Sequence, residues 1–234
     1  NTCPTDYTLT SNGGATVAHG CPINMPDHLE IQSSGSGLTC AANTLTIRAC
    51  ADAACATPHT SGVSGTLSAT GSPTVNWDGT TGGAAAAGFV IPNGSSSVTK
   101  NMQVATAGTV VFGIASPSPV PSNATTCNFG APSCTFTANT AGFIYSSTTT
   151  GSSYTIPAQV SGIATSTLYL RALEASTTNP AVCTPAIISQ TIPVSMGYTC
   201  NNPASCQTGD LTTINATAVA PGGTAVSLAF DANG

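Results

Sequence analysis

The stretch that decides the fold is Leu45-Thr46-Ile47-Arg48-Ala49-Cys50, in which apolar and polar side chains alternate. Such alternation is typical of a β-strand that buries one of its two faces. Similar short runs recur along the chain at 28–31, 98–104, 109–114, 143–145, 167–173, 187–196 and 224–231. Turn signals such as Asn93-Gly94 and Asn179-Pro180 separate them, and no stretch shows sustained helical periodicity. The sequence therefore predicts an all-β protein.

Many short strands with frequent turn signals favour tandem immunoglobulin-like β-sandwich domains. We expect a disulfide-closed N-terminal extension over 1–26 and a first immunoglobulin-like (Ig-like) domain over 27–138. A second Ig-like domain is expected over 139–206. The last residues, 207–234, are interpreted as the start of a further β unit or as an exchanged strand.

The ten cysteines of this 234-residue chain predict that disulfides staple these domains. Close spacing favours the pairs Cys3–Cys21, Cys50–Cys55, Cys127–Cys134 and Cys200–Cys206, which leaves Cys40 and Cys183 to pair over a long loop. An alternative joins Cys183 to Cys200 and reshuffles the others. Disulfides persist in oxidising compartments, so we expect a secreted, extracellular protein.

Metal binding is the competing interpretation of the cysteines. The spacings Cys50-x4-Cys55, Cys127-x6-Cys134 and Cys200-x5-Cys206 are wider than the Cys-x2-Cys of a usual zinc knuckle. The histidines form no repeated ligand pattern either. We therefore expect structural disulfides, with no metal and no cofactor.

Charged side chains are scarce, which excludes some classes of partner. They make up 5% of the chain, with three Lys or Arg and eight Asp or Glu, so Thr, Ser and Asn must supply most of the polar surface. Three scattered cations cannot neutralise several phosphates, which argues against nucleic acid and against anionic membrane surfaces. No apolar run is long enough for a membrane helix, so we expect no direct membrane insertion.

No residue pattern points to catalysis. Ser195 lacks the Gly-x-Ser-x-Gly elbow that exposes a nucleophile. His19, His28 and His59 are expected to be surface residues rather than general bases. Glu30 and Glu174 are the only glutamates, and Glu30 is expected on the outward face of its strand. We therefore predict no catalytic residues and no enzyme activity.

Two further residue types have a functional and a structural interpretation. Trp77 could contact a sugar from a loop, but a place in the core is favoured. The aspartates could supply oxygen ligands for Ca²⁺, but without an EF-hand or an acidic repeat they are expected to form turns. These aspartates are Asp27, Asp52, Asp78, Asp210 and Asp231.

Several segments resemble one known family. The segments are, in order, Asp27-His28-Leu29-Glu30-Ile31, Gly37-Leu38-Thr39-Cys40, the run from Leu45 to Cys55, Ala107-Gly108-Thr109-Val110, Thr167-Leu168-Tyr169-Leu170-Arg171-Ala172 and Cys200-Asn201-Asn202-Pro203-Ala204-Ser205-Cys206. Together they resemble the MshQ-type proteins of the mannose-sensitive haemagglutinin type IV pilus system. The resemblance implies a bacterial, secreted protein with tandem β domains and a link to pili and surface attachment. This chain is much shorter than full-length members and lacks their lectin-like jelly-roll domain.

Two functions follow as hypotheses. The first is a non-enzymatic adhesive protein of the bacterial cell surface, a pilus-associated adhesin or stalk module. The alternative is a self-assembling subunit of an extracellular fibre or sheath, polymerised by strand pairing between neighbours. The expected partners are other copies of the chain or other surface and pilus proteins, with glycans as a further candidate. Resemblance favours the first hypothesis, and low charge favours the second.

Overall fold

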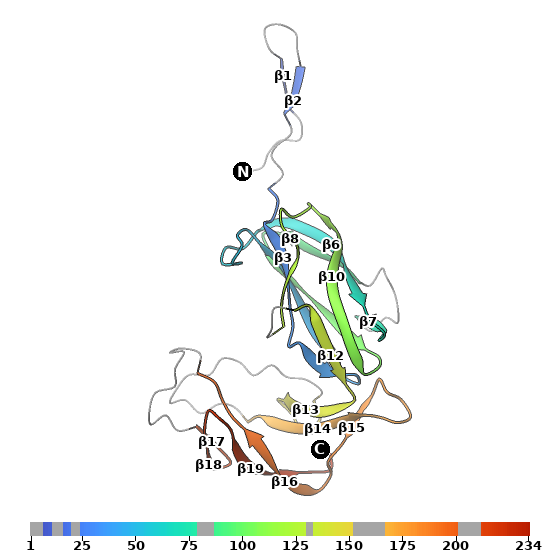
Figure 1. Cartoon of the computed structure of the whole chain (residues 1–234), viewed down its shortest axis with the longest axis vertical. Helices are drawn as coiled ribbons and strands as arrows, with labels where there is room; N and C mark the ends of the chain where they lie inside the picture. The colour runs from blue at the N-terminus through green and yellow to red at the C-terminus, as the bar shows by residue number, and fades with distance from the viewer. Residues whose placement is uncertain are drawn as a thin grey trace. The chain divides into compact units, whose positions relative to one another are not determined.

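The computed structural model describes residues 7–10, 16–19, 24–78, 87–129, 133–151, 167–200 and 212–234. Strands are the regular elements of these ranges, which contain no α-helix, so the predicted all-β class is confirmed. The chain divides into two compact units, Asn1–Asn139 and Thr140–Gly234, called unit 1 and unit 2 below (Figure 1).

Unit 1 contains two five-stranded sheets. The first has the order β4 (Ser36–Leu38), β12 (Thr135–Asn139), β10 (Gly108–Ser118), β6 (Ser61–Thr70) and β8 (Gly88–Asn93). The second has the order β11 (Thr126–Asn128), β3 (His28–Gln32), β5 (Asn43–Cys50), β9 (Ser97–Val104) and β7 (Val75–Trp77). The β4–β12 and β11–β3 pairs are parallel and the other pairs are antiparallel. A separate hairpin pairs β1 (Tyr7–Thr10) with β2 (Thr16–His19).

The two sheets of unit 1 enclose one hydrophobic core. Leu45 and Ile47 of the deciding stretch are fully buried, as their alternation predicts, and they share the core with Leu29 and Ile31. Aromatic rings join the sheets, because Phe112 of β10 lies with its centroid 5.8 Å from Trp77 of β7. Unit 1 is therefore a sandwich whose apolar faces pack against each other.

Strand β6 of this sandwich carries a row of hydroxyl groups on its outward face. Along β6, buried Val63 and Leu67 alternate with Ser64, Thr66, Ser68 and Thr70, which are half-buried or exposed. Successive side chains of a strand point to opposite faces of its sheet. Short hydroxyl side chains therefore form the polar surface here, as the scarcity of charge predicts.

Unit 2 is built from shorter sheets. β13 (Ala141–Ser146), β14 (Tyr169–Ala175) and β15 (Cys183–Pro185) form a three-stranded antiparallel sheet. β16 (Gln190–Met196) pairs with β19 (Thr224–Phe230), and β17 (Thr212–Ile214) pairs with β18 (Thr217–Val219). Among the described side chains of this unit, the buried apolar ones are Ala172, Leu173, Val219, Val226 and Phe230.

The division into two units can be compared with the predicted domains, and the extension expected over 1–26 falls within unit 1. The units meet between residues 139 and 140, one residue from the expected change at 138/139. The division into two units places no boundary at the expected 206/207, and β19 pairs with β16 along seven residues within unit 2. In-register antiparallel pairing satisfies the backbone groups on one edge of β19 inside its own chain. Residues 224–230 therefore lie within unit 2, and the further β unit or exchanged strand expected over 207–234 stays a prediction.

Candidate functional site

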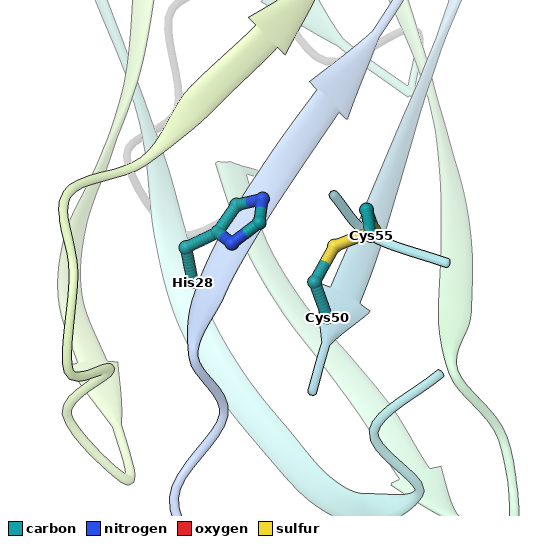
Figure 2. Close-up of side chains that lie close together, drawn as sticks. All are labelled: His28, Cys50 and Cys55. Atoms are coloured by element: carbon teal, nitrogen blue, oxygen red, sulfur yellow. A yellow bond between two sulfur atoms is a disulfide. The ribbon is translucent and has the colours of Figure 1, made fainter. Parts of the chain in front are cut away.

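The strongest cluster of chemistry-bearing side chains lies at one end of the second sheet of unit 1. His28 begins β3 and Cys50 ends β5, and the two residues are cross-strand partners. Cys55, in the loop after β5, lies beside both, and Figure 2 shows His28 close to the Cys50–Cys55 disulfide. Their candidate ligand atoms all lie within 4.8 Å of one another. We call this group the His28–Cys50–Cys55 cluster.

The cluster is almost closed to solvent. The exposed fractions are 3% for His28, 0% for Cys50 and 6% for Cys55. The cysteines form a disulfide with a Cα–Cα distance of 4.8 Å. A sulfur held in a disulfide is not a thiolate, and the thiolate is the form that binds metals. In this oxidised form the cluster is a cross-link between β5 and its loop.

Hydrogen bonds hold the loop 51–58 independently of the disulfide. The Asp52 carboxylate accepts N–H groups from Ala54, Ala56 and Thr57 at 3.0, 3.1 and 2.6 Å. Hydrogen bonds from Thr57 above all, and then from Ala56 and Ala54, lower the pKa of Asp52 to about 2. Arg48 donates to the Cys55 carbonyl at 3.1 Å and to Glu30 at 3.0 Å. The covering loop is therefore anchored by a carboxylate and a guanidinium.

The imidazole of His28 is oriented by a neighbouring carboxylate. Its Nδ1 lies 2.8 Å from Oδ1 of Asp27, whose Oδ2 accepts a hydrogen bond from Asn123 Nδ2 at 2.9 Å. A carboxylate next to one ring nitrogen favours a proton on that nitrogen, which leaves the other as the lone-pair donor. Nε2 is thus the nitrogen that Asp27 leaves available.

The disulfides of the described residues include two of the local pairs that their spacing favours. Cys127 and Cys134 are bonded, with their Cα atoms 5.1 Å apart, as are Cys50 and Cys55. Cys40, Cys183 and Cys200 are also disulfide-bonded. Cys3, Cys21 and Cys206 lie outside the described residues, so the Cys3–Cys21 and Cys200–Cys206 pairs stay predictions, as does Cys40–Cys183.

The expected surface position of two histidines is wrong. His28 and His59 are both buried. His28 lies beside Cys55 of the loop 51–58, and the backbone N–H of His59 donates to the Ala49 carbonyl beside the same loop. Burial lowers the pKa of His59 from its ordinary value of 6.5, and its Nε2 has no hydrogen-bond partner. For His19, on β2, the structure describes the backbone alone.

The residues considered for catalysis are not brought together. Glu30 lies in unit 1 and pairs with Arg48, and its strand neighbours confirm its outward position. Glu174 and Ser195 lie in unit 2, where both are exposed. All three histidines precede residue 60 and therefore lie outside unit 2. Ser195 accordingly has no histidine in its own unit.

The described aspartates form turn and loop contacts, as expected. The Asp78 carboxylate follows the last residue of β7 and accepts hydrogen bonds from Lys100 Nζ and from the Asn101 N–H. The Lys100 hydrogen bond lowers the pKa of Asp78. Asp231 accepts the N–H of Asn233 at 2.6 Å. Asp210 lies outside the described residues.

Trp77 is buried, so the interpretation as a core residue is confirmed. Its ring packs edge-on against Phe112, which also contacts Phe129 and Phe136 with centroids 6.2 and 6.3 Å away. Edge-to-face aromatic pairs of this kind add stability beyond the area that they bury. The ring is therefore not free to contact a sugar.

Arg171 is a buried cation that the sequence did not single out. It donates to the Gly151 carbonyl and, at 2.7 Å, to the Asn233 carbonyl, while its Nε has no partner. It thereby ties the turn after β13 to the end of the described chain. The only available signal was one arginine among apolar residues in Tyr169–Ala175, where alternation places it on the same face as the buried Leu173 and opposite the exposed Glu174.

Two family models match this chain. Residues 124–234 match a domain of unknown function (DUF6701), first Ig-like domain. Residues 26–120 match a domain of unknown function (DUF8613). Searches of curated proteins and of solved structures return no match.

The matches agree with the folded units in part. The first takes in unit 2 but begins earlier, so that it includes β11 and β12, which pair within the sheets of unit 1. With this match, the predicted Ig-like, disulfide-stapled β fold is confirmed. No helix among the described residues is both long and apolar enough to cross a membrane. The Ig-like match and the disulfides are consistent with an extracellular structural protein.

Proposed function

We propose that this chain is a non-enzymatic adhesive protein of the bacterial cell surface, acting as a stalk module of a pilus-associated adhesin. The observation that carries the proposal is that unit 1 is a β-sandwich closed by two disulfides, with a row of hydroxyl groups on the outward face of β6. Small uncharged side chains keep such faces hydrated while apolar side chains fill the core. Cross-links within unit 1 suit a module that must keep its fold outside the cell.

Other features support the same proposal. The ordered segments from Asp27 to Cys206 resemble the MshQ-type proteins, and residues 124–234 match an Ig-like domain. Short edges also suit a unit that stays apart from its neighbours. In the first sheet of unit 1, β4 has three residues and β8 carries Pro92, which has no N–H to donate to another chain.

The solution state of the purified chain tests this proposal. We expect light scattering to give the mass of a monomer, and negative-stain microscopy under non-reducing conditions to show isolated particles. Polymers with a constant repeat would contradict the stalk module. Binding of bacterial-surface or pilus extracts to immobilised chain would then identify a partner, with the heat-denatured chain as the unfolded control.

The edge of β19 favours the second candidate, a subunit polymerised by strand pairing. β19 has seven residues without proline or charge, and within the described residues it pairs on one side only, with β16. A long uncharged edge is a template for another strand. In a polymer, the free edge of β19 would receive a strand from the next copy.

A charge on this edge separates the two candidates. Ala225→Lys and Ala229→Lys place a cation on exposed positions of β19, which would stop strand pairing between copies. Thr66→Lys places the same charge on β6, an inner strand of its sheet. A fibre subunit should lose assembly in the β19 variants and keep it in the β6 variant. If all three variants assembled to the same extent, β19 would not be the strand that joins neighbouring copies.

A further inference from the structure

The His28–Cys50–Cys55 cluster has the composition of a metal site that a disulfide keeps closed. Two sulfurs and one imidazole are the ligands that Zn²⁺ prefers, and their atoms already lie within 4.8 Å of one another. In a tetrahedral zinc site, two thiolate sulfurs are about 3.8 Å apart, as follows from Zn–S bonds of about 2.3 Å. The two sulfurs, about 2 Å apart in a disulfide, must therefore separate by nearly 2 Å once the S–S bond is broken.

The loop has reasons to stay in place after that bond is broken. Asp52 holds the N–H groups of Ala54, Ala56 and Thr57, and the Cys55 N–H donates to the Asp52 carbonyl at 3.0 Å. Arg48 reaches from β5 to the Cys55 carbonyl. None of these contacts uses a sulfur atom. Reduction of the bond thus leaves Cys55 tethered over Cys50 and His28.

A hydrogen-bonding contact also orients the third ligand, His28. Asp27 engages Nδ1 of His28 and is itself held by Asn123. Histidines that bind metals commonly donate their other ring N–H to a carboxylate, which fixes the ring and raises its basicity. Asp27 supplies that contact in this chain, and the register pair His28–Cys50 fixes the distance between two of the ligands.

We propose that His28, Cys50 and Cys55 bind one Zn²⁺ ion when a dithiol reduces the Cys50–Cys55 bond. The dithiol gives up two electrons and two protons and becomes a disulfide, while the two cysteine sulfurs become thiols. Zn²⁺ then displaces a proton from each thiol and takes the lone pair of His28 Nε2. Three protein ligands leave one coordination position for water.

Disulfide and metal are thus alternative states of one site. An oxidising medium keeps the sulfurs bonded to each other, and a reducing one exposes them to the cation. The bound ion replaces the lost cross-link between β5 and its loop, because all three ligands come from these two segments and β3. This inference goes beyond the proposed function and does not depend on it.

Metal titration of the full chain tests the inference. The oxidised and the dithiol-reduced forms are titrated without oxygen with Cd²⁺, whose thiolate charge-transfer absorption counts the sulfurs bound, and then with Zn²⁺ against a chromophoric chelator. We expect the reduced form to bind an ion with two thiolates that the oxidised form does not bind. Circular dichroism follows the strand content throughout.

Matched variants assign the ion to this cluster. Cys50→Ser with Cys55→Ser should abolish the site, whereas Cys127→Ser with Cys134→Ser removes another disulfide of unit 1 and should keep it. His28→Gln should weaken binding, and Asp27→Asn should lower the affinity about 10- to 100-fold, as expected for an outer-shell carboxylate.

Several results would overturn the inference. The first is a Cys50/Cys55 double variant that binds the ion as the natural chain does. The second is an Asp27 or His28 variant with unchanged affinity. The third is loss of strand structure on reduction, because the site requires the loop to stay folded over β3 and β5.

Discussion

The two units of this chain reach a folded state by different means. Unit 1 buries a continuous core that includes three aromatic rings around Phe112, whereas the described part of unit 2 buries few large side chains and leaves Phe143, Tyr145 and Tyr169 exposed. Unit 2 instead buries a guanidinium, Arg171, against backbone carbonyls. The comparison shows that one unit depends mainly on apolar packing and the other more on polar contacts.

The largest effect is expected from breaking the core of unit 1. Phe112→Ala removes the ring that contacts Trp77, Phe129 and Phe136 and should lower the free energy of unfolding of unit 1 by about 3–5 kcal/mol. Trp77 is the only tryptophan, so its fluorescence during urea unfolding reports on unit 1 alone.

The neighbouring residue on the same strand is the control. Val111 points away from the core and is 46% exposed, so Val111→Ala should change the stability by about 0.5 kcal/mol or less. Equal losses in both variants would mean that the aromatic cluster is not what stabilises unit 1.

The next effect concerns the buried cation of unit 2. Arg171→Met removes two hydrogen bonds and leaves the carbonyls of Gly151 and Asn233 unpaired, which should cost about 1–3 kcal/mol. Hydrogen exchange along β13 and β14 measures the loss in unit 2.

An arginine in unit 1 provides the contrast. Arg48 is half-exposed and pairs with Glu30, so Arg48→Met should cost at most about 1 kcal/mol. If Arg171→Met lowered the stability no more than Arg48→Met does, the conclusion that unit 2 depends on polar contacts would be wrong.

A pH dependence sharpens the comparison, because all three histidines precede residue 60. The pKa of His59 is below 6.5 in the folded chain and at 6.5 in the unfolded chain. Below 6.5 the unfolded state therefore binds more protons, and the stability that His59 contributes is lost as the pH falls toward its folded pKa. We expect the urea midpoint of Trp77 fluorescence to fall over this range.

His59→Gln should flatten that dependence, because glutamine does not titrate. The hydrogen exchange of unit 2, which contains no histidine, should change less over the same pH range. A midpoint that falls equally with and without His59 would assign the effect to other groups.

The smallest effect is local to the loop after β5. Asp52 has a pKa of about 2, below its ordinary 3.8, so its contribution is present above 3.8 and is lost as the pH falls toward 2. Asp52→Asn should speed amide exchange of Ala54, Ala56 and Thr57, with little change in global stability because the side chain is exposed. Asp231→Asn is the matched change in unit 2, where the Asn233 amide should respond. Unchanged exchange at Ala56 and Thr57 would show that the carboxylate does not hold the loop.

The sequence predicted the strands whose apolar residues alternate. β5, β9, β10 and β14 lie where their patterns indicate, because burial of one face requires alternation. β6 was missed, since Ser61–Thr70 has only Val63 and Leu67 as large apolar residues among Ser, Gly and Thr. A strand of this composition is stabilised by its neighbours β10 and β8, which a local pattern cannot reveal.

The candidate site was less predictable than the fold. The spacing of Cys50 and Cys55 indicated a local cross-link, but nothing in the sequence showed that the loop between them would cover His28. That contact depends on the register in which β3 pairs with β5. Arg171 was hidden for a related reason, because its acceptors are carbonyls at residues 151 and 233, far away in sequence.

The junction between the units has a mechanical consequence. β12 ends at Asn139 and β13 begins at Ala141, so a single residue, Thr140, separates strands of different units. The Asn139 carbonyl is held by the Thr39 N–H at 2.9 Å, and the Thr140 carbonyl by the Ala175 N–H at 2.7 Å. A pulling force along the backbone therefore finds no linker here that could extend before the strands are loaded. Tension applied to one unit loads the hydrogen bonds of the next at once, so the chain can lengthen here only by rupturing a strand pair.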